Sequence, residues 1–407
     1  MVQVRPFRAI RPKEELAKEV AVLPYDVVDS QEAKEYAKGN PYSYFHIDRA
    51  EIDLDDLESP YEARVYEKAA ANLAKFLENG WLKQEEEAAY YLYRLTMNGR
   101  KQTGIVATTS IQEYLDGKIK KHEYTRPEKE VDRMNHIRAC DADTSPIFLS
   151  YRQTKPLETI MKEWPQTHVP LYRFTSFYEV THEVWAIDDA SVIAQIEAAF
   201  TEVPALYIAD GHHRTESAVK IGLEKREQGT ATPESEAFLA ILFPETELAI
   251  YEYNRIVNVP VEKAQLFEQL AKVFEINEIG YQKPSKKGEI NLLIADTWYQ
   301  LVVKEALRSS DPAASLDVAY LQEHVLTPLF GIEDVRTDKR IDFVGGIRGE
   351  QELEKKVASP DWVLAFEMYP TQMSDLLGVA DAGEIMPPKS TWFEPKLLSG
   401  LFVYSLA

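Results

Sequence analysis

The fold of this chain is decided by Ala205-Leu206-Tyr207-Ile208-Ala209-Asp210-Gly211-His212-His213-Arg214. The first five of these residues are apolar or aromatic, which predicts a buried β-strand. A polar string that contains a glycine follows at once, and Ala218, Ile221 and Gly222 then recur at helical spacing. A strand that runs directly into a helix is typical of α/β proteins.

Strand-like and helical patterns alternate along the rest of the chain. Asn98-Gly99 between two apolar runs predicts a β-hairpin. The remaining clear patterns predict a helix over 61–79, a strand over 44–47, a hairpin over 290–303 and a β-α-β unit over 341–368. We therefore predict a mixed α/β (α+β) protein with two interdependent lobes, residues 1–255 and 256–407.

Composition excludes several classes of protein. The chain has 407 residues, with 46 Lys and Arg against 67 Asp and Glu, which gives a net charge of −21. This acidity argues against a nucleic-acid-coating protein, which needs a basic surface. The single cysteine, Cys140, rules out an intrachain disulfide and a cysteine-cluster metal site. We see no apolar secretory signal and no membrane-spanning run, and so expect a cytoplasmic protein with a small-molecule substrate and neither nucleic-acid nor membrane partners.

The motifs of common enzyme classes are missing from the sequence. There is no G-x-x-x-x-G-K-[ST] phosphate loop, no G-x-G-x-x-G after a strand, no H-E-x-x-H helix and no G-x-S-x-G elbow. Any catalytic site must therefore be built from a different pattern.

The strongest candidate site is Asp210 to Arg214. Gly211 at a strand-to-helix junction allows the backbone to approach a ligand, and the start of the helix offers N–H groups to an anion. His212, His213 and Arg214 would add side-chain donors to phosphate. Asp210, at the end of the strand, would bind Mg²⁺ or act as a base.

A second cluster lies near the C-terminus, in Met386-Pro387-Pro388-Lys389-Ser390-Thr391-Trp392-Phe393-Glu394-Pro395-Lys396. The prolines restrict the backbone, and the residues after them offer two cations and two hydroxyls to an anionic group. The candidate anion-binding residues are Lys389, Ser390, Thr391 and Lys396. We expect Lys389 and Lys396 to share a cleft with His212, because one anionic reactant needs donors on more than one side.

Two further candidates carry acid or base groups. His122 and Glu123 form a possible acid/base pair, and Arg126 a possible anion clamp, at the start of a charged helix that also contains Arg133. Asp26, in a Pro-Tyr-Asp turn, is a fourth candidate carboxylate.

These motifs resemble those of a bacterial and archaeal family, the DUF1015 proteins. The resemblance rests on Ala209 to Arg214 and Met386 to Lys396, with shorter blocks at Arg5-Pro6-Phe7, Pro24-Tyr25-Asp26-Val27 and His122-Glu123-Tyr124-Thr125. The Asp210 to Arg214 string is also similar to the nucleotide-phosphate loop of the ParB/sulfiredoxin-like fold, on which free-serine kinases are built. This second resemblance implies a phosphate loop in the first lobe and a serine-like acceptor.

Three functions follow from these candidates. The first is a small-molecule kinase that uses ATP or ADP with Mg²⁺, with serine as the acceptor that the resemblance implies. The second is a metal-dependent hydrolase with ligands drawn from His122, Asp210, His212 and His213. The third is a nucleotide-sensing or protein-binding module without turnover.

Overall fold

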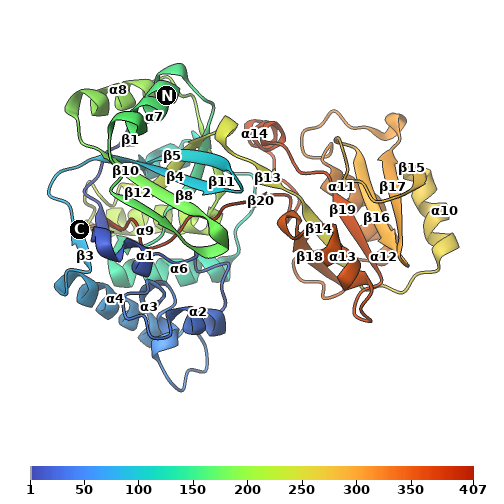
Figure 1. Cartoon of the computed structure of the whole chain (residues 1–407), viewed down its shortest axis with the longest axis horizontal. Helices are drawn as coiled ribbons and strands as arrows, with labels where there is room; N and C mark the ends of the chain where they lie inside the picture. The colour runs from blue at the N-terminus through green and yellow to red at the C-terminus, as the bar shows by residue number, and fades with distance from the viewer. Residues whose placement is uncertain (1) are drawn as a thin grey trace. The chain divides into compact units, whose positions relative to one another are not determined.

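The computed structural model describes residues 2–407, which form two compact units (Figure 1). One unit contains the chain up to Leu248 together with Pro395–Ala407, and the other contains Ala249–Glu394. The division differs from the expected one because the last residues of the chain return to the first unit. That segment is rich in apolar side chains, and Leu401, Phe402 and Val403 are at most 1 % exposed.

A large mixed sheet forms the centre of the first unit. The strand order is β6 (Ile119–Lys120), β11 (Leu206–Asp210), β8 (Ile147–Tyr151), β12 (Ala237–Pro244), β5 (Arg100–Ser110), β4 (Tyr90–Met97), β10 (Thr181–Ile187) and β9 (Tyr172–Thr175). Of the neighbouring pairs in this order, β11 with β6 and β12 with β8 are parallel, and the other five are antiparallel. A further strand, β1 (Val4–Arg5), pairs with β5.

The sequence explains the middle of this sheet. Every residue of β12 is buried, which fits its unbroken apolar run and its position between two partner strands. β4 and β5 form the predicted hairpin, and Asn98 (φ 51°) and Gly99 (φ 78°) both have the positive φ that a tight hairpin turn requires.

Helices cover the sheet of the first unit. α6 (Pro127–Cys140) and α9 (His212–Gln228) pack against each other below the sheet in Figure 1, and α4 (Ala63–Glu78) packs against α6. α7 (Lys155–Thr167) and α8 (Ala190–Thr201) lie above it. The shorter elements are α1 (Ala17–Val20), α2 (Ser30–Ala37), α5 (Ile111–Leu115) and the strand pairs β2 (Ile10–Pro12) with β3 (Leu82–Gln84) and β7 (Ala142–Asp143) with β21 (Tyr404–Ser405).

The predicted strand over 44–47 is wrong, because this segment is helical. α3 spans Phe45–Asp48. Tyr44, Phe45 and Ile47 are all fully buried. A strand would point Tyr44 and Phe45 to opposite faces, whereas a helical turn directs all three side chains into one core.

The second unit has its own antiparallel sheet. The predicted β-α-β unit forms, with β14 inserted between its two strands, because β18 and β19 both pair with β14. The predicted hairpin forms from β16 and β17. The strand order is β15 (Phe274–Ile279), β17 (Thr297–Val303), β16 (Glu289–Ile294), β19 (Leu364–Met368), β14 (Tyr253–Val257) and β18 (Ile341–Gly345).

The helices of the second unit include α13 (Gly349–Val357), whose Leu353 is fully buried in a core with Ile256 and Ala365. The other elements are α10 (Lys263–Val273), α11 (Asp317–Leu321), α12 (Thr327–Phe330), α14 (Met373–Asp381) and the pair β13 (Ile250–Tyr251) with β20 (Trp392–Phe393). In neither unit does a helix of residues 2–407 combine the length and apolarity needed to cross a membrane.

Candidate functional site

The junction between β11 and α9 forms as the sequence predicts. Gly211 links the two elements with φ 94°, a left-handed conformation that favours glycine. No side chain among residues 2–407 caps the start of α9, although the first N–H groups of a helix have no partner within it. Oδ1 of Asp210 accepts a hydrogen bond from the Gly211 N–H (2.8 Å), which fixes the carboxylate at the end of the strand.

Asp210 forms an ion pair with Lys396 across the first unit. Lys396 Nζ lies 3.2 Å from Asp210 Oδ2, and the two side chains are 18 % and 30 % exposed. Burial alone would raise the pKa of Asp210, but Lys396 and Arg214 outweigh this effect and hold the pKa well below its usual value. Asp210 is therefore an ionised carboxylate between two cations at neutral pH.

Arg214 is buried beneath the loop. Its Nη1 donates to the Pro146 carbonyl, and its Nε has no hydrogen-bond partner in the described part of the chain. A Cβ placed on Gly211 would lie 3.0–3.1 Å from the Arg214 guanidinium, so glycine is the residue that leaves room for this packing. Burial opposes the charge of Arg214, but Asp26 and Asp210 raise its pKa above the usual value.

A second buried arginine lies beside Arg214. Both line a small cavity of about 20 Å³, enough for one water molecule. Arg133 lies over the Tyr25 ring, 3.8 Å from its centroid, and pairs with Asp132 at 2.9 Å. The Tyr66 hydroxyl donates to Asp132 (3.0 Å). Sequence reasoning included Arg133 but missed Tyr66 and Asp132, because no local pattern links positions 66 residues apart.

His213 has a structural contact. Its Nε2 accepts a hydrogen bond from the backbone N–H of Arg126 (3.0 Å), at the start of α6. Burial and the charge of Arg126 lower the pKa of His213, which favours the neutral ring that this bond requires. His213 thus fixes the start of α6 against the start of α9.

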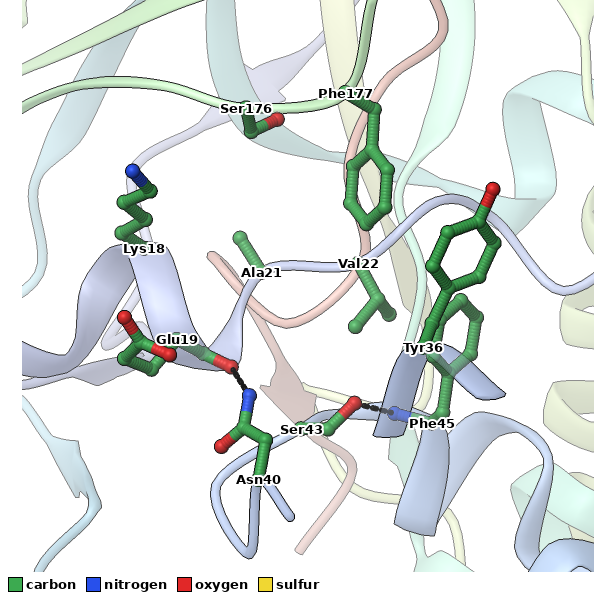
Figure 2. A pocket seen from close by; sticks show the side chains of 10 residues that line it. All are labelled: Lys18, Glu19, Ala21, Val22, Tyr36, Asn40, Ser43, Phe45, Ser176 and Phe177. Carbon is green, nitrogen blue, oxygen red and sulfur yellow. Dashed lines mark hydrogen bonds between the residues drawn. The ribbon is translucent and has the colours of Figure 1, made fainter. Parts of the chain in front are cut away.

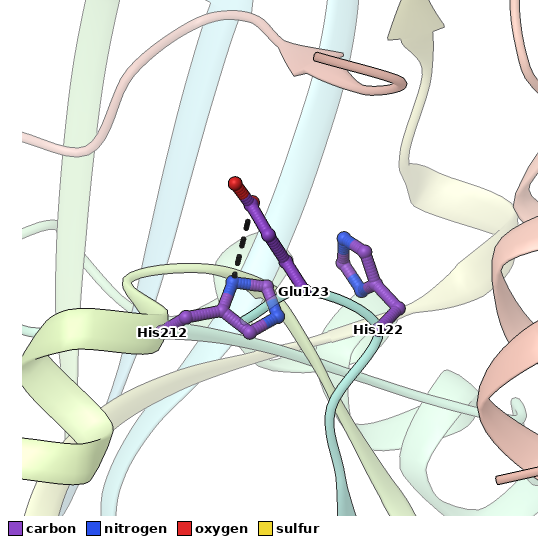
Figure 3. Close-up of side chains that lie close together, drawn as sticks. All are labelled: His122, Glu123 and His212. Carbon is purple, nitrogen blue, oxygen red and sulfur yellow. Dashed lines mark ion pairs between the residues drawn. The ribbon is translucent and has the colours of Figure 1, made fainter. Parts of the chain in front are cut away.

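His122, Glu123 and His212 form a compact cluster (Figure 3). His212 comes from the first turn of α9, and the other two come from the loop before α6. The rings of His122 and His212 are perpendicular, with centroids 4.5 Å apart, and His212 Nδ1 lies 3.9 Å from the Glu123 carboxylate. Each of the three residues offers one potential metal-ligating atom, and these atoms lie within 4.8 Å of one another. Among residues 2–407, this is the one group of three His, Cys, Asp or Glu side chains with such spacing. It contains Glu123 in place of the Asp210 and His213 that the sequence suggested.

Burial lowers the pKa of both histidines in this cluster. Burial lowers the pKa of His122 to about 4. The charge of Asp210 and the nearby Ile208 carbonyl, which lies outside hydrogen-bonding geometry, raise this pKa by a smaller amount. The pKa of His212 lies well below its ordinary value, because burial and the adjacent His122 both disfavour its charged form. Both rings are therefore neutral at pH 7.

Asp26 and the C-terminal motif complete the predicted set. Asp26 is exposed, and its charge acts on Arg214 and His213.

The C-terminal motif is divided, with Lys396 in the first unit and its other three candidates in the second. There, Lys389 Nζ lies 3.4 Å from the Tyr253 hydroxyl, and Ser390 donates to the Pro387 carbonyl. Lys396 contacts Asp210, a pairing that the sequence did not predict. The expected cleft of Lys389 and Lys396 with His212, and the ligand contacts of Ser390, Thr391 and Arg126, stay predictions.

Another hollow in the first unit has different chemistry (Figure 2). It measures about 230 Å³, and several of its polar groups bond to one another. Asn40 donates to the Glu19 carbonyl (2.8 Å), and the Phe45 N–H donates to the Ser43 hydroxyl (3.4 Å). The hollow contains none of the residues singled out in the sequence, so the loop after β11 remains the candidate site.

The family of the chain follows from its sequence profile. The family described as "Protein of unknown function (DUF1015)" matches residues 4–319. The chain belongs to this family. No protein of curated function matches it.

Several solved structures are distantly similar to this DUF1015 member. C-terminally truncated SbnI from Staphylococcus aureus is 13 % identical with a TM-score of 0.40, over 74 % of this chain and 87 % of that one. A mutant free serine kinase in complex with ADP is 11 % identical with a TM-score of 0.39, over 75 % and 95 %. A conserved hypothetical protein from Pyrococcus furiosus is 13 % identical with a TM-score of 0.36, over 74 % and 95 %. At this distance the likeness does not extend to ligands or activity.

Proposed function

We propose that this protein is a small-molecule phosphotransferase that takes a phosphoryl group from ATP or ADP, with the donor phosphates held at Asp210 to Arg214. The observation that carries this proposal is the uncapped start of α9 after Gly211. Unpaired N–H groups at the N-terminus of a 17-residue helix attract anions, and Gly211 lets the backbone approach them.

The charges around the loop support the same function. Phosphoryl transfer depends on positioning and on stabilising charge that develops on the phosphoryl oxygens. Arg214 and Lys396 supply two cations at the loop. Asp210 supplies a carboxylate, and Mg²⁺ in such sites is usually held by one or two carboxylates together with the substrate phosphates. Asp210 therefore fits as a protein ligand for Mg²⁺, which would neutralise phosphate charge when bound.

The acceptor needs a carboxylate base within hydrogen-bond reach of its hydroxyl. Asp26, Glu123 and Asp210 are the candidates, and His122 is an alternative base because its ring is neutral. Free serine is the first choice of acceptor on the resemblance of the loop to that of free-serine kinases. Arg126, which lies in the same unit as the loop, is assigned to the anionic group of the acceptor.

Turnover of the full chain tests this function. The protein is incubated with Mg²⁺, with ATP or ADP, and with a panel of hydroxylated amino acids and sugars, and products are identified by mass spectrometry. A phosphorylated acceptor is the expected product, and reactions with Asp210→Asn should form it far more slowly. Donor hydrolysis without a phosphorylated acceptor would instead indicate a hydrolase. Nucleotide binding without turnover of any donor would indicate a sensor, and both outcomes would contradict the proposal.

A further inference from the structure

Three buried ring nitrogens in the first unit have no hydrogen-bond partner in the part of the chain that the structure describes. They are both nitrogens of His122 and Nε2 of His212. The two side chains are only 2 % and 6 % exposed. Buried polar groups are nearly always paired, so adjacent histidines with three unpaired nitrogens call for an explanation.

The arrangement of the two rings and Glu123 fits a bound ion, to which each ring would give one nitrogen. His122 would use one of its two unpaired nitrogens, and His212 either its unpaired Nε2 or its Nδ1, which faces Glu123. Ligands at about 2.1 Å from a tetrahedral ion are about 3.4 Å apart. His212 Nδ1 and the Glu123 carboxylate are already 3.9 Å apart, and ligand atoms of the three residues all lie within 4.8 Å. Glu123 is 45 % exposed, so its flexible side chain has room to make the small remaining movement.

The two histidines are held in place by the surrounding fold. His212 lies in the first turn of α9, next to Gly211 and the ion-paired Asp210. The loop that carries His122 and Glu123 is fixed where the Arg126 N–H bonds to His213. The two segments therefore present a largely preformed site, which limits the ordering that an ion would have to impose.

We propose that His122, Glu123 and His212 bind one divalent transition-metal ion of the zinc class. Two imidazoles and one carboxylate are ligands that zinc accepts, and three protein ligands leave a fourth position for water or a substrate oxygen. Mg²⁺ and Ca²⁺ prefer oxygen ligands, so this site is distinct in chemistry from a magnesium site at Asp210. The carboxylate of Glu123 offsets part of the charge of the ion. The proposal does not depend on phosphotransfer.

Metal binding by the purified full chain tests this site. The protein is freed of metal with a chelator and titrated with Zn²⁺ alone in competition with a chromophoric chelator. We expect one equivalent to bind, and Co²⁺ in its place to give the visible absorption of a tetrahedral site. His122→Ala and His212→Ala should each weaken binding about 100-fold or more, and Glu123→Gln about 10-fold or more.

Two variants keep this test decisive. Glu123→Gln changes a half-exposed side chain, so it reports on binding even if loss of a buried histidine unfolds the protein. His168→Ala removes an exposed histidine stacked on Trp164 and should leave Zn²⁺ affinity unchanged. Failure of the metal-free wild-type protein to bind Zn²⁺ would overturn the proposal. So would binding that survives in folded His122→Ala and Glu123→Gln proteins, or binding lost in His168→Ala.

Discussion

Lys396 Nζ lies 3.2 Å from Oδ2 of Asp210, although 186 positions separate the two residues. The contact exists because the segment after Pro395 returns to the first unit, where β21 pairs with β7 and Val403 bridges to Ile10. The C-terminal segment is therefore part of the candidate site, and Lys396, together with Arg214, keeps the carboxylate at the end of β11 ionised.

Replacing Lys396 by methionine should destabilise the protein. Lys396→Met keeps most of the side-chain volume but removes the cation that pairs with Asp210, a mostly shielded carboxylate, and leaves Arg214 as the remaining nearby cation. Breaking such a pair costs about 1–3 kcal/mol in free energy of unfolding, measured by urea denaturation at pH 7. Lys155→Met removes a lysine that is 81 % exposed and paired with Glu158, and should cost well under about 1 kcal/mol.

The same pair predicts a pH dependence. Lys396 holds the pKa of folded Asp210 below its unfolded value of about 3.9, so the stabilisation is complete above that pH. It is lost as the pH falls through the folded pKa. The two unfolded chains take up the Asp210 proton alike, so the stability difference between wild type and Lys396→Met depends on the folded states alone. It should be constant near neutrality and shrink once the pH falls below the pKa of Asp210 in the folded variant. A difference that stays constant down to pH 3 would mean that the ion pair is not its source.

Gly211→Ala should lower the free energy of unfolding more than Gly229→Ala does. Both glycines flank α9 with positive φ, 94° and 70°. At Gly229 a Cβ meets nothing within 4 Å, so alanine costs only the left-handed conformation, about 1 kcal/mol. At Gly211 the Cβ would also crowd Arg214, and we expect about 2–3 kcal/mol by urea denaturation. Equal costs would show that Arg214 adapts freely.

Structure that depends on residues close together in the sequence could be predicted, whereas contacts between distant residues could not. The hairpin at Asn98-Gly99 and the β11–α9 junction depend on neighbouring residues, and both were predicted correctly. The contact of Arg214 with Pro146 spans 68 positions, and no periodicity reports it. The sequence identified donors in the loop, but it could not show that Arg214 lies beneath the backbone or that His213 is bonded to Arg126.

His182 should make the protein less stable in mild acid. The ring is 1 % exposed, accepts or donates at Tyr93 (2.7 Å) and Ser176 (3.2 Å), and burial lowers its pKa to about 3. The His182 imidazole has a pKa of about 6.5 in the unfolded chain, so below this pH it is protonated in the unfolded chain but not in the folded protein. The free energy of unfolding therefore falls by about 1.4 kcal/mol per pH unit. By pH 5 the loss relative to pH 7 should approach about 2 kcal/mol.

A variant without the ring isolates this effect from other titrating groups. His182→Asn retains a polar side chain but cannot take up a proton at these pH values. The stability of wild type minus that of His182→Asn, from urea denaturation at each pH, should therefore decline as the pH falls from 6.5 to 5. A flat difference would place the titration elsewhere.

The last prediction concerns Asp210 in phosphotransfer. Asp210→Asn removes the negative charge between Lys396 and Arg214, so both cations are left to attract phosphate. Donor affinity measured without Mg²⁺ should therefore be unchanged or tighter. Turnover with Mg²⁺ should fall about 100-fold or more if this carboxylate binds the ion or accepts the proton. Asp188→Asn makes the same change at an exposed position and should leave both quantities unaltered.

If folded Asp210→Asn turns over like wild type, the essential carboxylate must be sought at Asp26 or Glu123, by the corresponding amide variants. If it instead binds the donor more weakly without Mg²⁺, the loop does not hold phosphate in the way proposed.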